Sequence, residues 1–397
     1  MIRRYFDNAA TSFPKPPGVA EAMVAYMRDV GASAGRGAYR EAVESGKMLE
    51  RTRGAIRRLL GATPADPVIF TLNGSDALNI AIKGVLRPGD HAVTTALDHN
   101  SVLRPLGALE AQRGITWTAV EVDPRTTLLD AGAIEAAITP RTTLVVVNHA
   151  SNVTGAIQPI GEIAAICRRR GVLLAVDGAQ SAGHLPIDFA GLGVDLLATP
   201  GHKGLLGPLG TGVLLIRAGV EQGMQTFREG GTGSASEIAL QPEYAPDKFE
   251  AGSHNAVGLA GLLAAVEWLL ERGVESLRAH ERQLCAEMIA GLEAIAERSG
   301  GGFEWFGPRD PAARVGVFSI RVESLEPAEL AAILEERFGV LARAGLHCAP
   351  FAHRTIGTEA GGGTTRLSLG AFHTTDDVAA AIDALGRVAS TVLAPNA

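Results

Sequence analysis

The chain has 397 residues, of which 46% are hydrophobic and 20% charged, and a formal net charge of −7. This balance permits a large buried core in two or three domains and excludes wholesale disorder. No basic run is interleaved with aromatic residues, which argues against a nucleic-acid partner. We also expect no membrane association, because there is no secretory signal and no apolar run of the roughly 18 residues that span a bilayer.

The cysteines are few and far apart in the sequence. They are Cys167, Cys285 and Cys348. An odd number without a regular spacing argues against a disulfide framework and favours a reducing, cytoplasmic location. No spacing of Cys and His is typical of a metal site, so we expect no bound metal.

The first 255 residues alternate between short apolar runs and helical patterns, one of which covers Asp76 to Lys83. The runs typical of buried strands are 68–71, 91–95, 143–147, 172–176 and 195–198. Near-continuous apolar strands separated by helices predict an α/β fold with a mostly parallel sheet covered on both faces. Ligands of such sheets bind beyond the carboxyl ends of the strands.

The pattern changes after residue 255 and predicts a smaller α+β domain. Its expected helices are 256–271, 277–299 and 328–338, and its expected strands are 315–322 and 365–369. We therefore expect a large domain over residues 16–255. The small domain would combine residues 1–15 with 256–397.

Asp177 and Lys203 form the most informative pair of the chain. Asp177 ends an apolar run, and Lys203 lies 26 residues later in a glycine-rich segment. Pyridoxal phosphate requires such a pair, because a lysine amine forms a Schiff base with its aldehyde and a carboxylate keeps its ring nitrogen protonated. The alternatives are a helix N-cap for the acid and a solvated turn for the lysine.

Four segments extend this interpretation to a family. Phe6–Ser12, Asp177–Gln180, Gly201–Lys203 and Arg343–Pro350 together resemble the cysteine desulfurases and selenocysteine lyases. These are class-V-aminotransferase-like pyridoxal phosphate enzymes of fold type I. The resemblance covers essentially the whole chain and implies a homodimer with shared active sites.

The resemblance implies a role for several residues around the cofactor. Lys203 would carry the cofactor and move protons, with Asp177 on the ring nitrogen. Gln180 and Asn152 would lie near the phenolic oxygen, and Asn152 also near the substrate. His99 would stack on the ring and relay protons. A solvated loop histidine and a plain turn are the alternatives for His99 and Asn152.

The phosphate of the cofactor needs backbone N–H groups at a helix N-terminus. Gly74 and Ser75 open a predicted helix after a strand and meet that demand. By resemblance, His202 would also reach the phosphate. Pro200 stands where the family usually has Ser or Thr, and it offers neither a hydroxyl nor an N–H. That contact is lost or moved, with Thr199 as one candidate.

Further residues match the substrate side of the family site. Arg366 resembles the arginine that clamps a carboxylate with its planar fork, with Arg343 near it. Ser253 matches a threonine that the family contributes across the dimer interface. Cys348, flanked in sequence by His347 and other basic residues, matches the sulfur-accepting cysteine, because cationic neighbours favour a thiolate. Cys167 and Cys285 have the pattern of inert core residues.

The resemblance implies conversion of L-cysteine to L-alanine, with a persulfide on Cys348 that passes to an acceptor protein or thiol. The short stretch from Cys348 to Arg366 is similar to that of the group II enzymes, which favours a sulfur-accepting partner. Iron–sulfur cluster assembly is one of several pathways that could use this sulfur. The alternatives are a selenocysteine lyase, an aminotransferase or epimerase that does not use Cys348, and a cofactor-binding scaffold without turnover.

Overall fold

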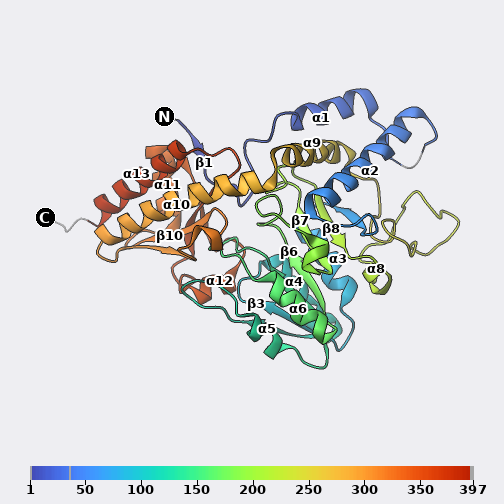
Figure 1. Ribbon diagram of the computed structural model, residues 1–397, viewed down its shortest axis with the longest axis horizontal. Helices are drawn as coiled ribbons and strands as arrows, with labels where there is room; N and C mark the ends of the chain where they lie inside the picture. The colour runs from blue at the N-terminus through green and yellow to red at the C-terminus, as the bar shows by residue number, and fades with distance from the viewer. Residues whose placement is uncertain (1, 35–36, 394–397) are drawn as a thin grey trace.

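The computed structural model describes residues 2–34 and 37–393. Its centre is a seven-stranded sheet with the strand order β2-β8-β7-β6-β5-β3-β4 (Figure 1). The strands are β2 (Val68–Thr71), β3 (His91–Thr95), β4 (Thr116–Val120), β5 (Thr142–Asn148), β6 (Leu173–Asp177), β7 (Leu196–Pro200) and β8 (Gly212–Ile216). Strand β8 pairs antiparallel with β2 and β7, and the other strand pairs of this sheet are parallel. The predicted α/β fold with a mostly parallel sheet is confirmed.

Both faces of this sheet are covered by helices because its strands are apolar on both sides. Val68 and Phe70 belong to one hydrophobic cluster, and Ile69 between them belongs to the other. Such alternation follows from the two-residue period of a strand. One face carries α3 (Gly74–Val85) and α4 (Asn100–Arg113), and the other carries α2 (Arg40–Leu60), α5 (Ala131–Ala137), α6 (Ile160–Arg170) and α9 (Ala256–Arg272).

Helix α9 packs on α2 and on α1 (Val19–Ala25), at the upper right in Figure 1. Leu259, Leu262 and Val266 of α9 are buried and belong to the core of the large sheet. The proposed boundary at residue 255 therefore precedes a helix that packs on the large domain. Residues 1 and 394–397 of the proposed small domain lie outside the described residues.

The C-terminal part forms a second layer of helices on an antiparallel sheet. Its strand order is β12-β13-β10-β9. The strands are β9 (Phe303–Phe306), β10 (Val317–Val322), β12 (Arg343–Gly345) and β13 (Thr364–Ser368), and the helices are α10 (Val274–Arg298), α11 (Pro327–Phe338), α12 (Pro350–Thr355) and α13 (Thr375–Val392). The N-terminal strand β1 (Arg4–Tyr5) pairs with β11 (Val340–Leu341), so the start of the chain lies against this part.

The sequence patterns locate most elements within a few residues but miss some. The expected strand 315–322 begins two residues later, at Val317. The edge strand β4 was not expected, since its exposed and half-buried side chains give it no continuous apolar run. None of the helices in the described part of the chain combines the length and apolarity that crossing a bilayer requires.

Candidate active site

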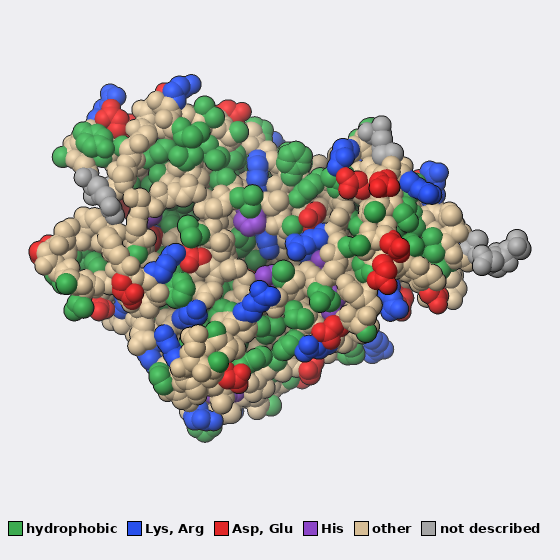
Figure 2. Space-filling view, turned by 180° about the vertical axis from the view of Figure 1, so that it is seen from behind, with side chains coloured by type: hydrophobic (Ala, Val, Ile, Leu, Met, Phe, Trp, Pro, Cys, Tyr) green, Lys and Arg blue, Asp and Glu red, His purple; other side chains and the backbone are tan. Residues whose placement is uncertain are grey.

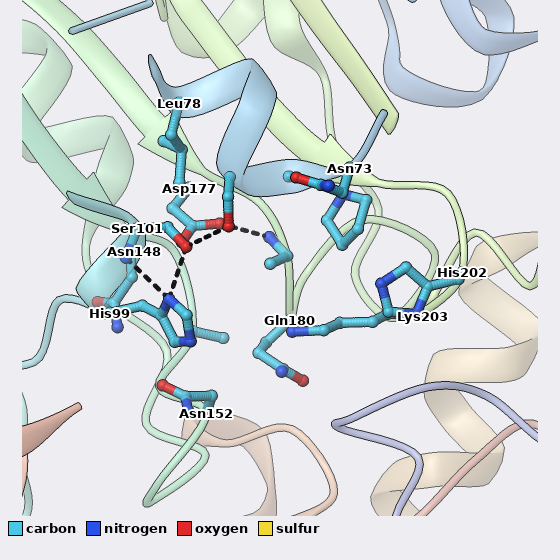
Figure 3. Close-up of a pocket in the computed structure, with 15 residues that line it drawn as sticks. Asn73, Leu78, His99, Ser101, Asn148, Asn152, Asp177, Gln180, His202 and Lys203 are labelled. Carbon is cyan, nitrogen blue, oxygen red and sulfur yellow. Dashed lines mark hydrogen bonds between the residues drawn. The ribbon is translucent and has the colours of Figure 1, made fainter. Parts of the chain in front are cut away.

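A cavity of about 100 Å³ lies beyond the carboxyl ends of β5, β6 and β7, where the first turn of α3 reaches them. Figure 3 shows side chains from these elements pointing into one common space. The sequence-predicted residues that line it are Gly74, Ser75, His99, Asn152, Asp177, Gln180, His202 and Lys203. The location is the one that a parallel sheet favours for ligands.

Asp177 and Lys203 carry the main charges of this cavity. Asp177 ends β6, is buried, and accepts a hydrogen bond of 2.9 Å from the Ala179 amide; no described side chain forms an ion pair with it. Burial raises the pKa of the Asp177 carboxyl, although the Ala179 amide and Lys203 lower it. Burial also lowers the pKa of Lys203 to about 8, with Asp177 opposing that shift. A buried carboxylate without a cationic partner favours binding of a cationic group.

His99 forms the wall opposite Lys203 (Figure 3). It is the N-cap of α4, and its Nδ1 accepts a hydrogen bond of 3.0 Å from the Ser101 amide. The Ser101 hydroxyl lies 2.8 Å from the same nitrogen and 2.6 Å from the Ser75 hydroxyl. Burial, with Lys203 and nearby arginines, lowers the pKa of His99 to about 4. The ring is therefore neutral, with its proton on Nε2.

The end of the cavity formed by α3 has the character of an anion site. The 12-residue helix α3 begins at Gly74, capped by Asn73, which accepts a hydrogen bond from its first turn. A Cβ on Gly74 would meet Pro200 Cδ at 3.0 Å, so the proline packs closely on this turn. His202 lines the cavity, and its buried Nδ1 has no hydrogen-bond partner in the described part of the chain. Thr199 does not line the cavity, and its hydroxyl lies near backbone carbonyls.

An N-terminal strap, defined here as residues 7–15, runs behind the Lys203 loop. The His202 carbonyl accepts hydrogen bonds from the Ser12 amide at 2.9 Å and from the Lys15 amine at 3.1 Å. The Ala9 carbonyl accepts one of 3.0 Å from the Gln180 amide. The first two contacts hold the peptide before Lys203, and the third holds the Gln180 side chain. No local pattern in the sequence could have predicted them.

Arg366 and Arg343 lie beside the cavity, on β13 and β12, and do not line it. They are direct cross-strand partners. Arg366 is only 1% exposed and donates to the Asp7 carboxylate at 2.8 Å and to the Asn152 carbonyl at 3.1 Å. Asp7 belongs to a segment that carries the family resemblance, but its sequence context predicts no such partner.

Cys348 lies in the loop between β12 and α12 and is exposed. It does not line the cavity, although its carbonyl accepts a hydrogen bond of 2.7 Å from Asn100 at the start of α4. His347 and His353 flank it in sequence, but both are buried, and burial lowers the pKa of His347 well below its usual value and that of His353 to about 4. The prediction that these two histidines act as cationic neighbours is therefore wrong.

The other two cysteines are structural. Cys167 lies in α6 and Cys285 in α10, and both are buried in hydrophobic clusters. Burial raises the pKa of each thiol to about 12. The expectation that they are inert core residues agrees with this burial.

Ser253 is exposed and lies in a different hollow, with Leu72 and Gly210. The structure of one chain does not bring it to the cavity that Lys203 lines. Its segment is held by Glu250, which accepts two hydrogen bonds of 2.8 Å from the buried Arg53.

Asp98, which sequence reasoning missed, is completely buried behind His99. Its Oδ2 accepts three hydrogen bonds, from the Thr94 hydroxyl and from the amide and hydroxyl of Thr95, while its Oδ1 has no partner among the residues that the structure describes. Burial raises the pKa of Asp98 to about 7 in spite of these donors. Asp98 fixes the turn between β3 and α4 and thereby the position of His99.

Comparison with known proteins tests the resemblance over the whole chain. Residues 4–381 match the model of the family described as aminotransferase class-V. The chain belongs to the class-V aminotransferase family. The family membership expected from the four sequence segments is thus confirmed.

Curated relatives and solved structures agree with this family. A protein of Methanothermobacter thermautotrophicus named probable cysteine desulfurase is 34% identical over 94% of this chain and 92% of its own length. A protein of Aeropyrum pernix with the same name is 35% identical over 98% and 94%. The apo structure of a cysteine desulfurase from Thermococcus onnurineus has a TM-score of 0.89 and 31% identity, covering 98% of this chain and 94% of that one. The fold type I architecture is confirmed by this likeness.

Proposed function

We propose that this protein is a pyridoxal phosphate-dependent cysteine desulfurase that converts L-cysteine to L-alanine. The observation that carries the proposal is that Lys203 and the unpaired buried Asp177 line one cavity together with His99. Relatives named probable cysteine desulfurase support it, because they match nearly the full length of the chain.

The residues of the cavity fit pyridoxal phosphate at both ends. Asp177 supplies a buried carboxylate for the ring nitrogen, and its lack of an ion pair among the described residues leaves it free for that role. The first turn of α3 and the unpartnered Nδ1 of His202 supply donors for a phosphate. When bound at Lys203, the cofactor supplies an electron sink next to the substrate Cα.

Different side chains of the protein carry out the proton transfer, the binding of the substrate and the sulfur transfer. Lys203, with a pKa of about 8, takes the Cα proton when its amine is neutral. Arg366 holds the substrate carboxylate, with Arg343 and Asn152 nearby. The Cys348 thiolate attacks the substrate sulfur, and an S–S bond forms as the carbon–sulfur bond breaks. The electron pair of that bond stays on the carbon, which takes up a proton and leaves as alanine.

The exposed position of Cys348 supports transfer of the persulfide to an external acceptor. Gln180 and Asn152 would contact the phenolic oxygen of the cofactor. Ser253, exposed at a distance from the cavity of its own chain, would contact the phosphate in the partner subunit of a homodimer. We place the enzyme in the cytoplasm, with iron–sulfur cluster assembly as one destination of the sulfur.

The test is to incubate the purified protein with L-cysteine and to measure alanine and sulfide. We expect equal amounts of both when a thiol reductant is present, and a large loss of both in Cys348→Ala. Alanine without sulfide or persulfide would contradict the proposal. Ser substitution of the buried Cys167 is the matched control and should leave both products unchanged.

Selenocysteine lyase is the second candidate, favoured by one observation. Cys348 lies outside the cavity lining, so a reaction whose leaving atom departs without attack by a thiol could proceed without it. Comparing Cys348→Ala on L-cysteine and on L-selenocysteine separates the two. If Cys348→Ala loses activity on L-cysteine but keeps it on L-selenocysteine, the desulfurase is supported. If the wild type is highly active on L-selenocysteine and not on L-cysteine, the lyase is supported.

A further inference from the structure

The guanidinium of Arg366 already holds a carboxylate in this structure, and that carboxylate is Asp7. Nη2 donates to Asp7 Oδ1 at 2.8 Å, and Nη1 donates to the Asn152 carbonyl at 3.1 Å. Nε is buried and has no hydrogen-bond partner among residues 2–34 and 37–393. A bidentate pairing with the guanidinium fork uses Nη1, Nη2 or both, so a substrate carboxylate would share a nitrogen with Asp7 or with the Asn152 carbonyl.

Asp7 lies on the open side of this pair. The Arg366 side chain is 1% exposed and the Asp7 side chain is 23% exposed. The backbone of Asp7 is held separately, because its carbonyl accepts hydrogen bonds from the Ala10 amide at 3.0 Å and from the Tyr5 hydroxyl at 3.2 Å. The carboxylate can therefore leave Arg366 by side-chain rotation, without moving the chain.

The local charges leave a place for one further anion. Arg343 lies directly opposite Arg366 across the β12–β13 pair and forms no ion pair with any described residue. Like charges in directly opposite positions repel each other. Among the described ion pairs Asp7 is the one carboxylate on these two arginines, so the pair has one uncompensated positive charge, which a monocarboxylate ligand would neutralise.

We propose that Asp7 is an internal competitor for the substrate carboxylate: it occupies Arg366 in the ligand-free protein and is displaced by the carboxylate of the amino acid. The proposal rests on the role of Arg366 in the proposed function. A carboxylate can bind only the molecules in which Asp7 has released Arg366. The apparent affinity for a carboxylate is therefore the intrinsic affinity multiplied by the fraction of such molecules. Asp7 also removes the cost of a buried unpaired guanidinium in the free protein.

Asp7→Asn shows whether Asp7 competes with the substrate carboxylate or orients Arg366, because the two roles change carboxylate affinity in opposite directions. A competitor that is removed lets carboxylates bind more tightly, whereas removal of a residue that orients Arg366 weakens their binding. The probe is propionate, which has the carboxylate and carbon skeleton of cysteine without its reactive groups. We expect its dissociation constant to fall by about tenfold in Asp7→Asn, the effect of losing one charge-assisted hydrogen bond.

Isothermal titration calorimetry with propionate measures this on the full-length protein, both with bound cofactor and without it. Propionamide is the uncharged control ligand and should bind neither protein. Asp29→Asn is the matched control variant, since it removes the same charge from an exposed pair with Arg28 and should bind propionate like the wild type. Circular dichroism and the melting temperature report whether Asp7→Asn is folded. We expect Asp7→Asn to melt at a lower temperature than the wild type. We also expect propionate to raise the melting temperature of Asp7→Asn by more than it raises that of the wild type.

Unchanged or weaker propionate binding by folded Asp7→Asn would overturn the competition and leave the proposed desulfurase intact. Absence of propionate binding by both proteins would overturn the carboxylate clamp at Arg366 as well. In steady state with L-cysteine, the competition predicts a lower KM in Asp7→Asn. A higher KM would count against it, and this readout separates release of Arg366 from a general loss of structure.

Discussion

Individual buried carboxylates around the cavity differ in what stabilises their charge. Asp177 has one backbone donor and Lys203 nearby, and a cofactor nitrogen would add to these. One carboxylate oxygen of Asp98 accepts three hydrogen bonds, the other accepts none from any described residue, and the pKa of Asp98 is about 7. Desolvation thus outweighs three hydrogen bonds at Asp98, which is half protonated near neutral pH.

Asp98→Asn should make the protein more stable above pH 7 relative to the wild type. The folded pKa of Asp98 is raised from 3.8 to about 7, so below pH 3.8 both states are protonated and the carboxyl costs nothing. As pH rises from 4 to 7 only the unfolded state loses the proton, and the free energy of unfolding falls by up to about 4 kcal/mol. Asparagine removes this loss and keeps an oxygen for the Thr95 donors.

Urea unfolding at pH 5 and pH 8 measures the difference between the two proteins. The exposed Asp383→Asn, which removes a carboxylate paired with Arg387, is the control and should show the wild-type pH dependence. Equal pH dependence in wild type and Asp98→Asn would show that Asp98 is ionised throughout.

Among the elements, the segment that carries Ser253 is fixed by one buried ion pair rather than by secondary structure. Glu250 receives two hydrogen bonds from Arg53 of α2 and one of 2.6 Å from the Phe70 amide of β2. His254 lies 2.6 Å from the same carboxylate. A helix, a strand and the segment are therefore joined at a single residue.

Glu250→Ala should destabilise the protein by about 3–5 kcal/mol, because it leaves the buried Arg53 without a counter-ion. The double variant Arg53→Met with Glu250→Leu removes both charges, so its stability should fall by less than that of Glu250→Ala. Thermal unfolding measures the stability of both. Retention of cofactor after gel filtration should fall in Glu250→Ala, since the Ser253 segment is released. A single variant as stable as the wild type would contradict this account of the pair.

At the scale of the whole molecule, apolar side chains are exposed around the hollow that contains Ser253. Leu72 lines this hollow and is 55% exposed, and Leu209, next to Gly210 of the same hollow, is 67% exposed. Figure 2 shows further hydrophobic side chains on the surface of the half formed by the large domain. Exposed apolar area of this kind is typical of a protein–protein interface, which supports the proposed homodimer.

Leu72→Asp combined with Leu209→Asp should shift the protein from dimer to monomer, because burial of two added charges opposes association. Sedimentation velocity measures the mass, and the cofactor content of the monomer should fall if Ser253 acts across the interface. Ile2→Asp, at a residue that is 70% exposed on the other part of the molecule, is the control. A double variant that remains dimeric with full cofactor would contradict the proposed interface.

The sequence alone determined the apolar strands, the sheet class, the Asp177–Lys203 pair and the family, because strand periodicity and motif spacing depend on residues close together in the chain. Only the tertiary structure decided that Asp7 neutralises Arg366, that Asp98 is buried and that His347 and His353 are neutral. Asp7 and Arg366 stand 359 positions apart. Burial and charge pairing depend on which distant segments meet, and this sets the pKa of each group where local patterns cannot.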